Sequence, residues 1–69
     1  MNWTNYRDAA KYKIKLYNES DKASRCLLIR EYNGYKHLFD DRGNKLTAFR
    51  TWEQLNDCLH AILIATNIW

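Results

Sequence analysis

The chain has 69 residues, of which 46% are hydrophobic and 28% are charged, and its formal net charge is +3 at pH 7. A chain of this length and apolar fraction forms one small domain over residues 1–69 and is not a disordered protein. No long uncharged apolar run is present, which excludes a membrane-spanning segment and a membrane partner.

The first regular segment is KYKIKLY, residues 11–17. Tyr12, Ile14 and Leu16 alternate with lysines at the period of a half-buried strand, so we expect a strand here. A helix is the alternative that this pattern favours less. After a polar loop at 18–24, RCLLIREY at 25–32 predicts a second strand inside the sheet.

The dipeptide Asn33-Gly34 predicts a two-residue type I′ turn, because both central positions of that turn need a positive φ. The turn leads into a strand over 35–39 and determines the cross-strand register. The predicted partners are Tyr32 with Tyr35, Glu31 with Lys36, Arg30 with His37, Ile29 with Leu38, and Leu28 with Phe39.

A second turn, Asp40 to Gly43, suits a type I turn with Gly43 in the left-handed region, followed by a strand over 45–49. Continuing the register without interruption gives four further pairs. They are Leu46 with Leu38, Thr47 with His37, Ala48 with Lys36, and Phe49 with Tyr35.

Thr51 and Gln54 have the spacing of a capping box, which predicts a helix over about 52–66. The expected fold is α+β, a three- to four-stranded antiparallel meander with the C-terminal helix packed on one face. The expected core combines one helical stripe with one face of the sheet. Its members are Leu27, Ile29, Leu38, Leu46, Leu55, Leu59 and Ile62.

A second apolar stripe of this helix lies on nearly the opposite side and contains Ala61, Ile64, Ala65 and Ile68. Such a stripe requires cover, which predicts self-association as a homodimer through the C-terminal helix. The alternative is intramolecular cover by Trp3 and Tyr6.

The predicted register divides the sheet into an aliphatic face for the helix and a second face that is aromatic and basic. The second face carries Cys26, Leu28, Arg30, Tyr32, Tyr35, His37, Phe39, Lys45, Thr47 and Phe49. We expect partner contacts at Arg30, Tyr32, Tyr35 and His37, with Lys45 and Phe49 at the margin. The alternative is that the aromatic residues only cover a thin core.

Catalytic and metal chemistry are not indicated. Cys26, His37, Cys58 and His60 lack the close spacing of zinc ligands, so we expect no metal and no cofactor. No Ser or Cys stands with an identifiable base and orienting partner, so we expect no enzyme activity. The first ten residues contain no secretory signal, which predicts a cytoplasmic protein with free, buried thiols.

Function is therefore expected to come from binding. All eleven lysines and arginines lie in residues 1–50, and the sequence pI is about 9.0. The leading hypothesis is a protein-binding inhibitor or adaptor acting on a larger protein or nucleoprotein complex. The chain is rich in Asn, Lys, Tyr and Ile, as AT-rich genomes favour, and a short phage or mobile-element protein that blocks a host defence complex, as anti-CRISPR proteins do, fits this composition.

The alternative is a nucleic-acid-binding domain that uses the basic aromatic face, and a third reading is a subunit that stabilises a larger assembly. The order of strands and helix over residues 24–66, with FRTWEQL after the last strand, resembles the three-strand-plus-helix DNA-binding modules of plant transcription factors and phage integrases. That resemblance includes no specific motif and implies the nucleic-acid reading.

Overall fold

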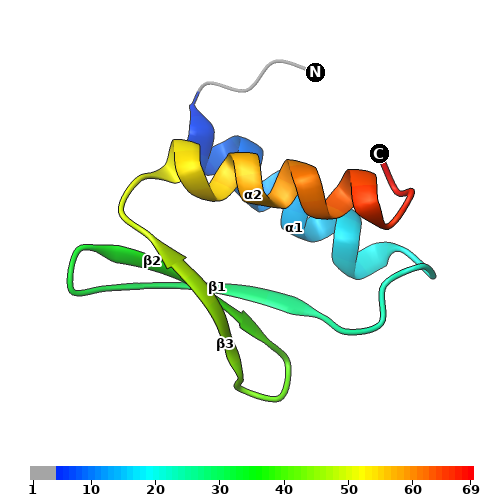
Figure 1. Cartoon of the computed structure of the whole chain (residues 1–69), viewed down its shortest axis with the longest axis horizontal. Coiled ribbons are helices and arrows are strands. Elements are labelled where there is room, and N and C mark those ends of the chain that lie inside the picture. Colours follow the sequence, from blue (N-terminus) through cyan, green and yellow to red (C-terminus); the bar gives the residue numbers. More distant parts are fainter. Residues whose placement is uncertain (1–4) are drawn as a thin grey trace.

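The computed structural model describes residues 5–69, which form two helices and a three-stranded antiparallel sheet, and this confirms the α+β class. In chain order the elements are α1 (Tyr6–Glu19), β1 (Leu27–Tyr32), β2 (Tyr35–Asp40), β3 (Lys45–Phe49) and α2 (Trp52–Ala65). The helices lie side by side and run in the same direction, on one side of the sheet (Figure 1). The strand order is β1-β2-β3, so β2 is central.

The predicted strand over residues 11–17 is wrong, because this segment belongs to helix α1. Asn5 caps the helix by accepting a hydrogen bond from the Asp8 backbone N–H at 2.8 Å. The buried side of α1 consists of Ala9, Ala10, Lys13 and Tyr17, which are spaced at the period of a helix. The alternation of lysines and apolar residues concealed this period because Lys13 itself is buried.

Helix α1 has its most extensive contacts with α2, and Lys13 lies between the two helices. Its side chain is 3% exposed, and its Nζ donates a hydrogen bond to Asn56 Oδ1 at 2.7 Å. The Nζ atom also lies 5.3 Å from the centre of the Trp69 ring. Burial lowers the pKa of Lys13 below its usual 10.5, and the nearby Asp57 opposes that shift.

The first hairpin confirms the prediction at every pair. Asn33 and Gly34 both have positive φ, 54° and 77°, as a type I′ turn requires. The observed register joins Tyr32 to Tyr35 and continues without a break to Leu28 opposite Phe39.

The second hairpin confirms the turn and corrects the register beyond it. Gly43 has φ 86°, and its N–H donates to the Asp40 carbonyl at 3.1 Å. Phe39 pairs with Lys45, but Leu38 then pairs with Thr47, so Leu46 is an extra residue in a bulge. Every residue after the bulge is shifted by one position.

The shift exchanges the faces of β3, because side chains alternate along a strand. Phe49 pairs with Lys36 and not with Tyr35, and it packs against the core. Ala48 pairs with His37 on the opposite face. The predicted placement of Phe49 and Thr47 on the aromatic face is therefore wrong, as is the predicted burial of Leu46, which is 36% exposed.

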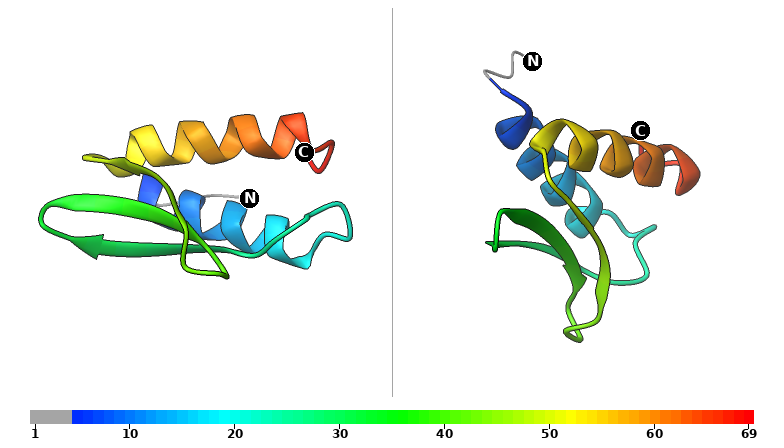
Figure 2. Two further views of the ribbon diagram at one scale, coloured as in Figure 1. Left: turned by 60° about the horizontal axis from the view of Figure 1, so that its bottom comes forward. Right: turned by 60° about the vertical axis from the view of Figure 1, so that its left-hand side comes forward.

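Helix α2 begins as predicted, with Thr51 Oγ1 accepting a hydrogen bond from the Gln54 N–H at 3.1 Å. It packs most extensively against α1 and meets the sheet mainly at β3 (Figure 2). Its buried residues are Leu55, Leu59 and Leu63. Ile29 and Ile62, both predicted core members, are partly buried against that core. The buried residues of the core form one cluster, which contains Ala10, Tyr17, Leu27, Leu38, Leu55, Leu59 and Leu63.

The second stripe of α2 is mostly uncovered. Ala61 and Ala65 are exposed and Ile64 is 52% exposed, whereas Ile68 packs against the core. Tyr6, one of the two predicted covering residues, is itself 50% exposed on α1, and Trp3 lies outside the described residues. Self-association through this stripe stays a prediction.

Candidate functional site: the open face of the sheet

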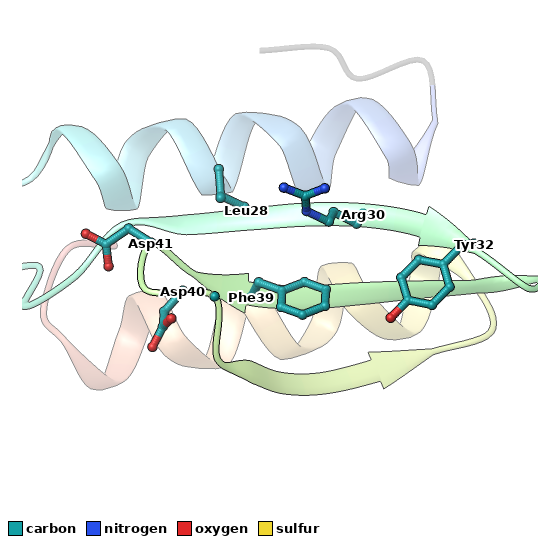
Figure 3. Close-up of a pocket in the computed structure, with 7 residues that line it drawn as sticks. Leu28, Arg30, Tyr32, Phe39, Asp40 and Asp41 are labelled. Carbon is teal, nitrogen blue, oxygen red and sulfur yellow. The ribbon is translucent and has the colours of Figure 1, made fainter.

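The side of the sheet that faces away from α2 is the candidate binding site, and we call it the open face. In Figure 3, α2 lies behind the sheet and α1 runs past the edge of β1. Alternation along the strands, corrected for the bulge, determines which residues it contains. The open face consists of Leu28, Arg30 and Tyr32 from β1, Tyr35, His37 and Phe39 from β2, and Lys45 and Ala48 from β3.

Three of these side chains expose large apolar surface. Leu28 is 45% exposed, Tyr32 is 46% exposed and Tyr35 is 36% exposed. They are held by a sheet whose other side is packed against the helices, so their positions do not depend on a partner. Exposed tyrosine rings carried on a sheet are typical of binding sites, because tyrosine offers a large contact area at a small cost in side-chain entropy.

His37 lies on the open face as predicted, but it is buried there. Its ring is stacked on Tyr32, with 3.9 Å between ring centres and 4° between planes, and Phe39 and Tyr35 lie beside it. The residue is only 6% exposed. Neither ring nitrogen has a hydrogen-bond partner within residues 5–69. A partner that docks on this face therefore meets the ring of Tyr32 before it meets His37.

Arg50 is a member of the site that the predicted register did not find. The shifted register brings it beside Tyr35, the place predicted for Phe49. Its Nε donates a hydrogen bond to the Tyr35 hydroxyl at 3.1 Å, and its guanidinium lies 5.4 Å from the centre of the same ring. The bulge thus puts a cation, and not a second aromatic ring, next to Tyr35.

A shallow depression of about 410 Å³ lies on the open face. Figure 3 shows Arg30 on β1 and Phe39 on β2 along this depression, Tyr32 nearer the hairpin end, and Asp41 at the opposite end. Its lining residues are Leu28, Arg30, Tyr32, Phe39, Asp40, Asp41 and Gly43. The depression is therefore mainly apolar, with charges of both signs at its rim.

The acidic end of the depression is fixed by the turn. Asp40 Oδ1 accepts hydrogen bonds from the backbone N–H groups of Asn44 at 2.8 Å and Arg42 at 3.0 Å. Asp40 Oδ2 accepts a third from the Asn44 side-chain amide at 3.1 Å. The two Asn44 bonds chiefly, with the one from Arg42, lower the pKa of Asp40 below its usual 3.8. Asp40 is thus an anion that shapes the turn, and Asp41 is the exposed acid of the pair.

Other chemistry in the described part of the chain is limited. Within residues 5–69, no group of three or more His, Cys, Asp or Glu side chains is placed to hold a metal ion. Neither α1 nor α2 is long and apolar enough to cross a membrane. Both cysteines are free thiols, but Cys26 is exposed, so its predicted burial is wrong. Burial raises the pKa of the Cys58 thiol, which makes it a poor nucleophile.

Comparison of the chain with protein-family models, with curated proteins and with solved structures finds no significant match. A function is therefore inferred from the residues and geometry of the open face.

Proposed function

We propose that this chain is a non-enzymatic binding protein whose open face docks on a larger protein. The observation that carries the proposal is the preformed, uncovered group of Leu28, Tyr32 and Tyr35, with Arg30 beside them. Tyrosine and arginine are the residue types that most often anchor protein interfaces. By binding, the chain blocks or bridges its partner, and we place it among the short phage or mobile-element proteins that inhibit host defence complexes.

The positions of the cations favour a protein partner over a nucleic acid. Lys11 and Lys15 lie on α1, which runs beside the outer edge of β1, and not among the aromatic residues of the open face. Lys36 lies on the helix side, where its Nζ donates to the Arg50 carbonyl at 2.9 Å. On the open face itself, Arg30, Lys45 and Arg50 share the surface with the acidic turn. A surface that binds phosphates gathers positive charges along a continuous track without acidic groups among them.

Nucleic acid remains the second candidate because one observation favours it. Tyr32 presents an exposed ring, braced from beneath by His37, next to an exposed Arg30. A ring held in this way is suited to stacking against an unpaired base.

Affinity capture from bacterial lysate, with and without nuclease, tests the proposal. We expect the wild-type chain to retain a protein partner under both conditions. The double variant Tyr32→Ala/Tyr35→Ala should weaken binding by more than about 2 kcal/mol, or roughly 30-fold. Tyr6→Ala is the matched control, because Tyr6 is equally exposed but lies on α1.

Two outcomes would contradict the proposal. If the folded double variant binds as tightly as Tyr6→Ala, the aromatic residues are only structural. If capture is lost with nuclease, and affinity for the recovered nucleic acid falls steeply and log-linearly with salt, the second candidate is correct.

A further inference from the structure

The two edges of the sheet are protected differently. Because β2 is central, β1 and β3 each have one edge without a neighbouring strand from residues 5–69. The bulge at Leu46 interrupts the edge of β3, and a bulge is one way in which proteins prevent further strands from adding. Strand β1 is six residues long, pairs without a bulge, and contains no proline.

Asn18 shows which backbone groups of β1 point outward. Its side-chain amide accepts a hydrogen bond from the Leu27 N–H at 2.7 Å and donates one to the Leu27 carbonyl at 3.0 Å. In an antiparallel strand, alternate residues direct both backbone groups to the same side. Since the backbone N–H and C=O of Leu27 point away from β2, so do those of Ile29 and Glu31. Within residues 5–69, no hydrogen bond engages the outward groups of these two residues.

A groove runs beside this edge, between β1 and α1. It has a volume of about 230 Å³ and is lined by Lys11, Ile14, Asn18, Leu27, Leu28 and Ile29. Its apolar wall combines Ile14 of α1 with residues of β1. Lys11 stands at its rim, and Lys15, one helical turn further on, is also exposed.

We propose that the free edge of β1 binds an extended segment of a partner protein, which adds as a fourth strand beside Ile29 and Glu31. A polypeptide is the occupant because two N–H donors and two C=O acceptors, repeating every second residue at about 6.6 Å, match the backbone of another strand. Alternate side chains of the segment point toward α1, where the groove takes an apolar residue and Lys11 and Lys15 attract acidic ones. The added strand ends before Leu27, since Asn18 already bonds the backbone N–H and C=O of that residue.

This site adjoins the open face and shares Leu28 with it, but its backbone donors and acceptors belong to Ile29 and Glu31, so it stands whether or not the open face binds a partner. The test uses a phage-displayed library of random linear peptides, panned on the immobilised wild-type chain, with the enriched peptides synthesised and titrated. We expect sequences that alternate apolar and acidic residues. Their binding should protect the amides of Ile29 and Glu31 from hydrogen exchange.

Glu31→Pro is the variant that removes an outward N–H, and an edge strand accepts proline where that N–H faces solvent. It should weaken the enriched peptides about tenfold or more, whereas Glu31→Thr, which keeps the N–H, should bind within about threefold of wild type. If Glu31→Pro does not fold, a synthetic chain N-methylated at Glu31 removes the same donor without changing the side chain. Lys11→Glu should also weaken acidic peptides.

Three results would overturn the proposal: no enriched peptide, equal affinity for the wild type and the folded N–H-deleted chain, or no protection of the Ile29 and Glu31 amides. Sedimentation of the wild type provides a fourth. A dimer that dissociates with Glu31→Pro, but not with Ile64→Glu, would show that a second copy occupies the edge.

Discussion

Leu27 and Leu28 are neighbours in β1 with the same side chain, yet one is 1% exposed and the other is 45% exposed. The first belongs to the core cluster that also contains the leucines of α2, and the second lies on the open face. The difference follows from the two-residue period of a strand and from helices that cover only one side of the sheet. One side of the sheet therefore holds the fold together, and the other side is available for contact with a partner.

The largest expected effect separates these two leucines. Leu27→Ala removes buried methyl groups and leaves a cavity, so it should lower the free energy of unfolding by about 2–5 kcal/mol. Leu28→Ala, the identical change one residue later, should cost less than about 1 kcal/mol. Urea denaturation of both variants measures the difference. Equal losses would mean that the open face is covered and contributes to the core.

A second pair tests the bulge, which decides the faces of β3. Phe49 packs against the core and Leu46 does not, so Phe49→Ala should cost about 2–3 kcal/mol, and Leu46→Ala less than about 1 kcal/mol. The uninterrupted register predicted from sequence gives the opposite order. Thermal or urea unfolding that ranks Leu46→Ala as the more damaging change would restore that register and return Phe49 to the open face.

The first hairpin was predictable because its information is local. Asn33-Gly34 permits one tight turn, and every pair back to Leu28 and Phe39 follows from that turn. The second turn was predictable in the same way, because Gly43 marks its left-handed position. Phe39 and Lys45 pair next to it. The bulge at Leu46 was not predictable, because no residue type marks an extra residue in a strand. Its consequence is visible only in the packing of Phe49 against the core.

Helix α1 was misread for a different reason. Its apolar period includes Lys13, whose burial depends on Asn56 and Trp69, far away in the sequence. No local pattern marks a lysine as buried. The signal that indicates a helix is Asn5 followed by Asp8, an N-cap and an acid in the first turn, ahead of two alanines. For the site, sequence predicted the face and its β1 and β2 residues, but not Arg50.

A smaller effect is expected at His37, the open-face residue whose side chain is buried. Both ring nitrogens lack partners within the described chain, so His37→Phe removes desolvated polar atoms and keeps a ring beneath Tyr32. We expect the free energy of unfolding to rise by about 1 kcal/mol. His60→Phe on α2 is the control and should change it little. A loss of stability in His37→Phe would show that its nitrogens are hydrogen-bonded in solution, for example to water.

The smallest effect concerns Asp40, in the turn between β2 and β3. Because hydrogen bonds from Asn44 and Arg42 lower the pKa of Asp40 in the folded chain, Asp40 binds protons more weakly there than in the unfolded chain. Its contribution to stability is therefore present above about pH 4 and is lost as the pH falls through the lowered pKa.

Melting temperatures measured between about pH 5 and pH 2 test this dependence. Asp40→Asn should lower the melting temperature at pH 5 and flatten the acid decline, because asparagine does not titrate and offers a single acceptor oxygen. Asp41→Asn, one residue away and exposed, should leave the profile parallel to that of the wild type. If both variants flatten the decline equally, the acid sensitivity comes from general charge at the turn. The hydrogen bonds that hold the acidic end of the open face would then not be its cause.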